Sequence, residues 1–379
     1  MSNFASLMES YNSAGLIKKG RMNDPGYLKN LAEANNLINK VISGKAPSHM
    51  LTEAMGTSDF PILLGDNLSS RLLGAYTEAP STYQSWCYIN RNVRDFRTQY
   101  LKYLNTGNLL EKVKEGQKGP EVPVPEEGQY YYAVETYEET MKFSWEMLVN
   151  DDLNAFQTLP ATLGQDAKNT VERFATSLIV DANGPHAAMF KNEGNQHNLI
   201  TNKLSADGLR AGVKAFRAIR KPNGQPMNTT PAILAVAPAL EETAKDLLGA
   251  SNLMFANLNT ANSKQVGFTL QNTNRFGGLQ LCVLDWLPTI VTDSTAADES
   301  WFLLGDPNVG RGAFEIGFLR GIGDQPLVLR KRGDAEVLGG MEAAIGDFDS
   351  RSFEYKVLHA FGGCQKDWRF AVGSKGSGT

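Results

Sequence analysis

The feature that most constrains the fold of this chain is a long amphipathic pattern between residues 160 and 181. Apolar residues recur there at spacings of three and four, at Leu163, Ala167, Val171, Phe174 and Leu178. This pattern predicts one helix over Pro160–Asp181 that buries a single face, started by Thr158 and Pro160 and ended by Ala182-Asn183-Gly184. At 1.5 Å per residue such a helix is about 33 Å long, so it crosses a whole domain.

A long hairpin is predicted before this helix. Residues 105–129 hold four glycines, three prolines and eight charged residues, yet strand-forming residues flank them at Phe96–Leu101 and from Tyr130 onward. The apolar positions of the return strand change parity between Val134 and Met141, which predicts a β-bulge near Glu138. We expect an ordered hairpin that lies on another copy of the chain, because its own domain cannot bury the aromatic side chains or cover the open strand edges.

The remaining segments predict a mixture of helices and strands. A polar N-terminal segment has one helix at Tyr27–Ile42, and a second helix begins near Pro61. After the long helix, the pattern predicts an α/β unit with helices at Ser205–Arg220 and Ala239–Leu248 around a buried strand at Ala232–Val236. Further strands are expected at Leu279–Leu284, Trp301–Leu304, Phe314–Leu319, Leu327–Arg332 and Phe353–Phe361. A turn at Gly362-Gly363 and a flexible tail, GSKGSGT, complete the prediction.

Composition narrows the possible partners. The chain has 37 basic and 41 acidic side chains, for a net charge of −4, which disfavours tight binding of nucleic acid. No apolar run approaches the ~20 residues that cross a bilayer, so no membrane partner is expected. The cysteines, Cys87, Cys282 and Cys364, are isolated and odd in number, which favours free, buried thiols.

The sequence predicts no catalytic, cofactor-binding or metal site. Gly305–Gly312 lacks the Lys-Ser/Thr pair of a phosphate loop, and we interpret it as a turn. Gly321-Ile322-Gly323 lacks the third glycine of a dinucleotide site, and the four histidines have no metal-ligand spacing. His359 alternates with aromatic residues, which favours a hydrogen-bonded strand histidine over a catalytic base. The glutamates around the hairpin favour solvated charge over acid–base chemistry.

The order of these elements resembles that of the major capsid proteins of tailed bacteriophages with the HK97-type fold. The resemblance covers roughly residues 55–373 and rests on element order and local patterns, not on one diagnostic motif. In that family the hairpin is the extended loop, matched here by Leu101–Trp145, and the long helix is the spine of the peripheral domain, matched by Pro160–Asp181. Ser205–Leu304 matches the axial domain, which meets its neighbours around five- and sixfold axes, and Phe314–Val372 matches the peripheral strands.

The resemblance implies an α+β fold with an N-terminal arm, an extended β-hairpin loop, a peripheral domain with a long spine helix, and an α/β axial domain. The implied boundaries are 1–55 for the arm, 56–104 for the start of the peripheral domain, 105–140 for the hairpin loop, 141–203 for the peripheral domain with the spine helix, 204–305 for the axial domain, and 306–379 for the closing peripheral strands and tail.

The implied function is structural, without enzymatic activity or cofactor. Copies of the chain would form the pentamers and hexamers of an icosahedral shell around double-stranded DNA, which it would bind only weakly. The shell would be assembled in the cytoplasm of a bacterial host and become part of the virion. Scaffolding, portal and decoration proteins are further partners that the resemblance allows.

The residues expected to touch a neighbouring copy lie on the hairpin, at Lys112, Lys114, Lys118, Tyr130 and Tyr132. Some members of the family join a lysine of this loop covalently to an asparagine of a neighbour. The stretch before the last long strand here offers Asp347 and Asp349 instead, and a carboxylate needs activation before it can acylate a lysine. We therefore expect a non-covalent shell.

Two other functions remain open at this stage. The first is an encapsulin, a bacterial nanocompartment shell of the same fold, against which the long N-terminal arm and the chain length argue. The second is an α/β enzyme built around residues 232–248, which a pocket with convergent polar groups would favour.

Overall fold

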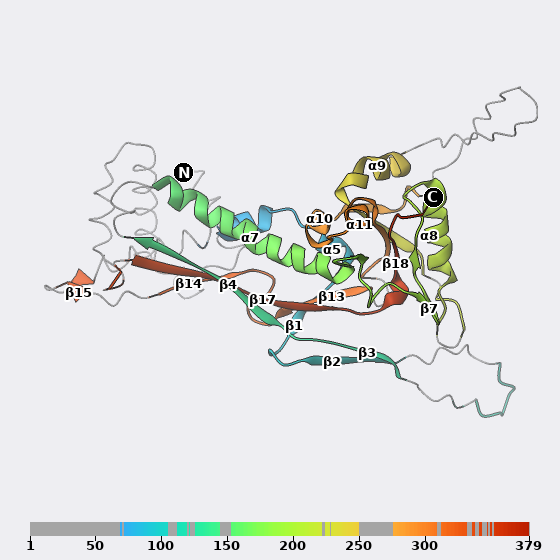
Figure 1. Ribbon diagram of the computed structural model, residues 1–379. Coiled ribbons are helices and arrows are strands. Elements are labelled where there is room, and N and C mark those ends of the chain that lie inside the picture. Colours follow the sequence, from blue (N-terminus) through green and yellow to red (C-terminus); the bar gives the residue numbers. More distant parts are fainter. Residues whose placement is uncertain are drawn as a thin grey trace, which may run out of the picture. The chain divides into compact units, whose positions relative to one another are not determined.

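The computed structural model describes residues 69, 72–104, 112–119, 121, 126–144, 153–221, 224–227, 229–249, 276–308, 312–331, 336–337, 341–342, 347, 349–350 and 352–378. The predicted N-terminal arm and its helix at Tyr27–Ile42 lie outside these residues. Helices and strands are mixed along the chain (Figure 1), which confirms the expected α+β class, and their order is the one that the HK97-type resemblance implies.

The chain forms two compact units. Of the described residues, those up to Pro80, Glu135–Thr170 and Leu319–Phe361 make up the first unit, and Ser81–Val134, Val171–Phe318 and those from Gly362 onward make up the second. Three of the described elements contribute residues to both units, the helix α7 and the strands β13 and β17.

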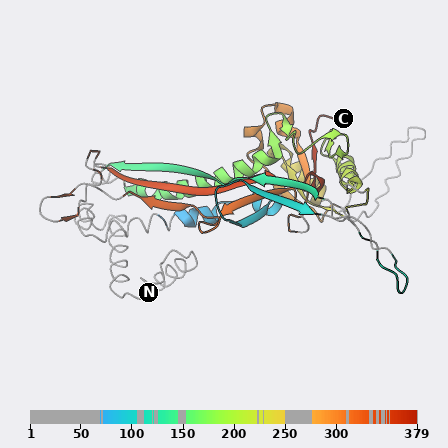
Figure 2. The same ribbon diagram turned by 90° about the horizontal axis from the view of Figure 1, so that it is seen from below.

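In the first unit, helices pack on three paired antiparallel strands. The strand β17 (Ser352–Gln365) pairs antiparallel with β14 (Leu327–Arg330) and with β4 (Glu135–Ser144). The helix α7 (Leu153–Ile179) lies along one side of these strands (Figures 1 and 2), and residues 72–78 form a further helical segment. Leu72, Leu73, Leu163 and Val357 form its described core. A short hairpin, β15 (Glu336–Val337) with β16 (Met341–Glu342), completes this unit.

The second unit is built on a five-stranded mixed sheet. Its order is β11 (Gln280–Val283), β10 (Pro231–Val236), β12 (Trp301–Gly305), β18 (Ala371–Ser374) and β9 (Leu199–Ile200). The strand β10 is apolar throughout because it has neighbours on both edges and helices over it, as the sequence predicted. The helix α8 (Ala206–Ala218) buries Leu209 and Phe216 against this sheet, and Ser205 caps its start by accepting a hydrogen bond from the Gly208 N–H.

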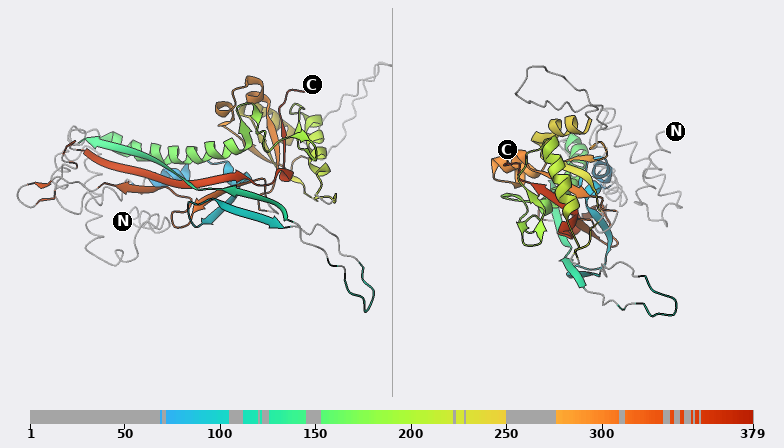
Figure 3. Two further views of the ribbon diagram at one scale, coloured as in Figure 1. Left: turned by 60° about the horizontal axis from the view of Figure 1, so that its bottom comes forward. Right: turned by 90° about the vertical axis from the view of Figure 1, so that its right-hand side faces the viewer.

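Shorter elements surround this sheet. The helices are α5 (Tyr83–Trp86), α9 (Glu241–Gly249), α10 (Leu287–Ile290) and α11 (Ser294–Glu299), with 3₁₀ turns η1 (Pro238–Leu240) and η2 (Trp368–Phe370). The short strands pair as β5 (Val180–Asp181) with β6 (Gly184–Pro185) and β7 (Asn192–Glu193) with β8 (Gln196–His197). The strands β1 (Tyr88–Val93) and β13 (Phe314–Leu319) pair with each other, and β13 pairs with β17. Finally, β2 (Gln99–Leu104) and β3 (Glu126–Tyr132) form a separate two-stranded ribbon (Figure 3).

The long helix differs from its predicted bounds at both ends. It begins at Leu153 and passes through Pro160, so Thr158 and Pro160 do not start it. One proline removes a single backbone hydrogen bond from a helix of 27 residues. The helix ends at Ile179, because Val180 and Asp181 turn into the β5–β6 pair. The Asp181 carboxylate stabilises this turn by accepting hydrogen bonds from the N–H groups of Asn183 and Ala187.

Three predictions about the strands are wrong. No bulge lies near Glu138, since β4 and β17 pair without a register shift. The alternation of apolar side chains changes instead at Ala133-Val134, between the end of β3, which pairs with β2, and the start of β4, which pairs with β17. Gly362 and Gly363 do not form a turn but lie inside β17, where an added Cβ would come within 2.0 Å of the Ala133 carbonyl oxygen and 2.6 Å of the Glu315 carbonyl oxygen. The tail is not free, because Lys375 and Gly378 donate backbone hydrogen bonds to Ile200 and Thr201.

Other predictions are confirmed. Pro307 and Asn308 lie in a turn, and the three cysteines are free thiols, of which Cys87 and Cys282 are buried and Cys364 is partly buried. The strand position of His359 is confirmed, since it is buried in β17 and packed edge-on against Tyr76 and Phe361, whereas the hydrogen bond expected of its ring stays a prediction. In the described residues, no helix combines the length and apolarity that a bilayer crossing requires.

Replacement of Gly164 by alanine tests the packing of α7 on residues 72–78. A Cβ at Gly164 would lie 2.4 Å from the Leu72 carbonyl oxygen, whereas one at Gly74, on the facing helical segment, meets nothing within 4 Å. Alanine favours a helix by about 0.5–1 kcal/mol over glycine, but a backbone clash costs about 1–3 kcal/mol. We expect Gly164→Ala to lower and Gly74→Ala to raise the free energy of unfolding, measured by urea denaturation. Equal effects of the two changes would contradict this packing.

His359 should make the first unit sensitive to acid. Burial lowers the pKa of this imidazole from 6.5 to about 4, more than the opposing influence of Asp324, while the Lys168 charge lowers it further. Between these values the unfolded chain binds a proton that the folded chain excludes, so stability falls as the pH drops from 6.5 toward 4. Between pH 7 and 4.5, we expect the free energy of unfolding of the His359→Leu variant to fall by about 2–3 kcal/mol less than that of the unmodified chain. Urea denaturation at each pH measures this difference. Parallel pH profiles of the two proteins would contradict the assignment.

Candidate functional site at the root of the hairpin

The β2–β3 ribbon has two distinct faces. Its register places Tyr100 opposite Tyr131 and Leu101 opposite Tyr130, and the ribbon carries one irregularity between Tyr103 and Leu104. Because side chains alternate along a strand, Tyr130 and Tyr132 share one face, and Tyr100 and Tyr131 share the other. Tyr132 is only 4% exposed, whereas Tyr100 and Tyr131 are 68% and 63% exposed. The inward face therefore anchors the ribbon, and the outward face is open.

The inward face is held by the carboxylate of Glu315, which is buried in β13. The Tyr132 hydroxyl donates to its Oε1 atom over 3.0 Å, and the Tyr130 hydroxyl donates to its Oε2 atom over 3.2 Å. The Asn90 amide of β1 also donates to Oε1, over 3.1 Å. A buried carboxylate is costly unless such donors surround it, so Glu315 joins the two hairpin tyrosines firmly to the second unit.

Lys366 supplies the positive charge at this cluster. Its Nζ atom donates to Glu315 Oε2 over 2.8 Å, and in this ion pair the Glu315 side chain is buried and the Lys366 side chain is partly buried. The same ammonium group lies 4.5 Å from the centre of the Tyr88 ring and 5.2 Å from that of Tyr130. The Lys366 N–H donates to the Ala313 carbonyl, which keeps the lysine beside β13. Cation–π contact and charge pairing together offset the cost of burying the lysine.

The tyrosines in this cluster are poor acids. Burial, reinforced by the negative charge of Glu315 and by the hydrogen bonds to it, raises the pKa of Tyr130 and of Tyr132 well above the usual range. Both hydroxyls therefore remain protonated and act as hydrogen-bond donors at all physiological pH values. The cluster is suited to holding the ribbon in one orientation, not to proton transfer.

Gly317 provides the space for Tyr132. A Cβ at Gly317 would lie 2.5 Å from a ring carbon of Tyr132 and 2.8 Å from Val93. The strand β13 therefore presents a carboxylate at Glu315 and a gap at Gly317, two residues later on the same face. The hydroxyl of Tyr132 bonds to the carboxylate, and its ring occupies the space at Gly317.

The residues predicted as contacts to another chain lie in two places. Lys112, Lys114 and Lys118 are exposed beyond the ribbon, and Lys118 forms an ion pair with Glu121. Tyr130 and Tyr132 lie against Glu315 of their own chain; whether they also touch a second chain stays a prediction. The expectation that the hairpin cannot bury its aromatics in its own domain is wrong for Tyr132.

Sequence reasoning missed Glu315, Lys366 and Asn90. The signal for Glu315 was present, since it is the one charged residue in the otherwise apolar strand Phe314–Leu319. A lone carboxylate in a buried strand indicates buried donors nearby. The identity of those donors depends on segments far apart in the sequence, so the pattern alone could not supply it.

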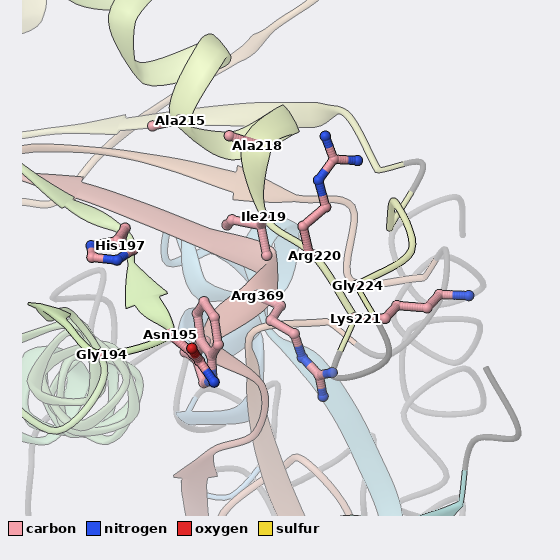
Figure 4. A pocket seen from close by; sticks show the side chains of 11 residues that line it. Gly194, Asn195, His197, Ala215, Ala218, Ile219, Arg220, Lys221, Gly224 and Arg369 are labelled. Carbon is pink, nitrogen blue, oxygen red and sulfur yellow. The ribbon is translucent and has the colours of Figure 1, made fainter. Parts of the chain in front are cut away.

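A second feature of this unit is a cavity of about 720 Å³ beside the end of α8 (Figure 4). Its charged lining residues are Arg220, Lys221 and Arg369, whose side chains extend in different directions (Figure 4). Arg369 is paired with the buried Asp367 carboxylate over 2.9 Å, and the His197 ring is bonded to Asn192 over 2.7 Å. The lining residues therefore lack the convergent polar groups that an enzyme site requires. Within the described ranges, no group of three or more His, Cys, Asp or Glu side chains is placed to hold a metal ion.

The Glu315 cluster can be tested by removing one charge and then both. Glu315→Gln leaves the partly buried Lys366 without its anion, and we expect it to lower the free energy of unfolding by about 3 kcal/mol. Adding Lys366→Met should recover more than half of this loss, because the unpaired charge is then gone as well. Glu315→Gln should also lower the pKa of the two inward tyrosines in a spectrophotometric titration. Additive losses in the double variant, or an unchanged tyrosine titration, would disprove the coupling.

Comparison with solved structures gives distant likenesses. The mature capsid of bacteriophage PhiM1 is 13% identical, with a TM-score of 0.47 over 78% of this chain and 86% of that chain. A chain of Mycobacterium phage Adephagia is 10% identical, with a TM-score of 0.44 over 80% of this chain and 89% of that chain. The virus-like particle of Pyrococcus furiosus is 10% identical, with a TM-score of 0.42 over 82% and 98%. These likenesses are too weak to assign a role to any residue.

Comparison of sequences is more decisive. No curated protein matches the chain. The sequence model of a family described as phage capsid protein matches residues 127–374. This match spans 248 of the 379 residues, from β3 through β18, and so includes the Glu315 cluster apart from Asn90 and Tyr88. The chain therefore belongs to the phage capsid protein family and is a structural protein, not an enzyme.

Proposed function

We propose that this chain is the major capsid protein of a tailed phage, and that its copies form the pentamers and hexamers of an icosahedral shell around double-stranded DNA. The observation that carries the proposal is the capsid family match over residues 127–374. A capsid protein acts through association with its own copies, and it is a component of the virion. Assembly of the shell takes place in the cytoplasm of the bacterial host.

The proposed roles of the segments follow the resemblance to the HK97-type fold. Residues 1–55 act as an arm, 105–140 as the extended loop, and 204–305 as the axial domain around the symmetry axes. Residues 56–104, 141–203 and 306–379 make up the peripheral domain, with α7 as its spine. In support, α7 is long and continuous, and the ribbon is a separate sheet with one open face.

The hairpin supplies contacts between copies in this proposal. Lys112, Lys114 and Lys118 are exposed and meet a neighbouring copy through charge pairs. Tyr130 and Tyr132 contribute by fixing the orientation of the ribbon through Glu315. The shell is non-covalent, because the stretch that would supply an acyl donor to a lysine carries Asp347 and Asp349 in place of asparagine.

The partners other than the chain itself are weakly held or transient. The net charge of −4 is consistent with a shell that binds its DNA only weakly. Scaffolding, portal and decoration proteins are the classes of protein that a shell of this kind accepts. An encapsulin is the alternative shell function, and it has less support because the family that matches is one of phage capsid proteins.

Assembly of the purified chain tests the proposal. We expect closed particles tens of nanometres across by negative-stain microscopy and light scattering, because a shell repeats modest contacts many times. A chain that stays strictly monomeric at high concentration would contradict the capsid function. Particles that package a cargo protein in place of DNA would support the encapsulin instead.

Shortening the hairpin separates folding from assembly. Replacing residues 105–125 by a short Gly-Ser turn keeps the paired strands β2 and β3 and the Glu315 cluster. Halving a loop changes its closure entropy by only about 0.6 kcal/mol, so the subunit should fold with near-native circular dichroism and melting. We expect the shortened protein to form no closed particles. Normal assembly would show that residues 105–125 do not join neighbouring copies.

A further inference from the structure

The cavity beside the end of α8 (Figure 4) is not used by the shell contacts proposed above. Its volume of about 720 Å³ lies within the range of sites that bind ligands. All of its lining residues belong to the second unit. The cavity is therefore a feature of that unit alone, and its shape does not depend on how the two units are arranged.

Two walls of the cavity are fixed by the side chain of Asn198, which is fully buried. Its Nδ2 group donates to the carbonyl oxygen of Trp368, in η2, over 3.2 Å. Its Oδ1 atom accepts hydrogen bonds from the Lys191 N–H over 3.0 Å and from the Gln196 side chain over 3.1 Å. Lys191 precedes β7 and Gln196 lies in β8, so one buried amide joins the β7–β8 hairpin to η2.

The third wall is the end of α8 and the turn that follows it. Ile219 is buried there, and the backbone of Lys221 donates a hydrogen bond to Gln225 over 2.9 Å and accepts one from Gly224 over 2.8 Å. Gly224 has a φ of +77°, a backbone conformation that favours glycine, so the sequence supports this tight turn. Because hydrogen bonds hold its walls, the cavity exists before any partner arrives, and little free energy is lost in ordering it.

The rim of the cavity carries an excess of positive charge. Arg220 and Lys221 line it, and Lys214 lies one helical turn before Ala218, another lining residue. Lys214, Arg217 and Arg220 are exposed, and neither they nor Lys221 form an ion pair with another described residue. The end of a helix carries only about half a negative charge, so the α8 dipole does not neutralise these four cations.

The interior of the cavity is largely apolar. Ala215, Ala218 and Ile219 supply aliphatic groups from the α8 side, and Trp368 lines it from η2. The charged side chains extend in different directions (Figure 4), so they cannot converge on one small anion. A peptide with several carboxylates and an apolar side chain between them matches both the spread of the cations and the apolar interior.

We propose that this cavity binds an acidic segment of a partner protein, whose carboxylates meet the cationic rim while an apolar side chain enters the interior. Charge complementarity decides the class of partner, because the four cations of the rim repel a basic segment. The partner is a protein other than a second copy of this chain. The inference therefore goes beyond the proposed shell and does not rest on shell formation.

Nucleic acid is the other polyanion that a basic rim attracts. A DNA duplex, whose major groove alone is about 12 Å wide, is too large to enter the cavity and would leave the apolar interior uncovered. A single strand can enter, but proteins that bind it stack successive bases on several aromatic side chains. Trp368 is the one Trp, Tyr or Phe among the described residues that line this cavity. The acidic peptide is therefore favoured, and an oligonucleotide is the competing outcome of the test.

Fluorescence anisotropy of the full chain with a short labelled peptide, made of glutamates interrupted by leucines, tests the proposal. We expect saturable binding that weakens as salt is added, because the rim contacts are electrostatic. The same peptide with lysine in place of glutamate should not bind. A peptide with serine in place of leucine should bind about fivefold more weakly, because the apolar interior then lacks its occupant.

Variants locate the binding. Arg220→Glu with Lys221→Glu should weaken it about tenfold, because attractive contacts become repulsive. Ala218→Phe should weaken it as well without changing the charge, because the ring fills the interior, whereas Ala218→Ser leaves the cavity open and should bind normally. Arg94→Glu with Arg97→Glu is the charge control, since both arginines are exposed in the same unit but outside the cavity. Circular dichroism checks that each variant is folded.

Three outcomes would overturn the proposal. The first is that the unmodified chain does not bind the acidic peptide. The second is that the control at Arg94 and Arg97 weakens binding as much as the changes at the cavity, since overall charge alone would then attract the peptide. The third is that a single-stranded oligonucleotide binds more tightly than the peptide and loses its binding in Ala218→Phe. Failure to form particles would contradict the capsid function but would leave peptide binding unchanged, so the two failures are distinguishable.

Discussion

The buried carboxylate of Glu315 is the interaction on which the hairpin depends. It receives hydrogen bonds from Tyr130, Tyr132, Asn90 and Lys366, which come from three separate segments of the chain. Burying a carboxylate is unfavourable without such partners, so the cluster forms completely or not at all. This dependence converts a flexible two-stranded ribbon into an element with a fixed orientation. An assembly surface on the ribbon is useful only if that orientation is the same in every copy.

The two faces of the ribbon have different roles because of strand geometry. Successive side chains of a strand point to opposite sides, so Tyr130 and Tyr132 face inward and Tyr131, between them, faces outward. The same residue type therefore serves two purposes: hydroxyl groups hold the root, and exposed rings remain available for a partner. A shift of register by one residue would exchange these roles, and the pairing of β2 with β3 prevents it.

Much of the fold was predictable because local patterns and tertiary structure agree there. The apolar run at β10, the amphipathic spacing of α8 and the ribbon were all expected, and each appears where the sequence indicated. The errors lie where an element meets a distant segment. Gly362 and Gly363 looked like a turn, yet they let β17 pass the Ala133 and Glu315 carbonyls at close range. A glycine can indicate either a reversal of the chain or a close approach of another backbone segment, and only the segment packed against it decides which.

The sequence by itself determined the fold class, the helical and strand periods, the capsid resemblance, and the presence of an aromatic hairpin. These depend on spacing within a segment, which the chain carries locally. Only the tertiary structure decided which tyrosines turn inward and that Glu315 receives them, because a donor lies as many as 225 residues from Glu315 in the sequence. It also decided where α7 ends and that the tail is tied to Ile200 and Thr201. Contacts of such separation are set by the packing of whole units, and no local pattern encodes them.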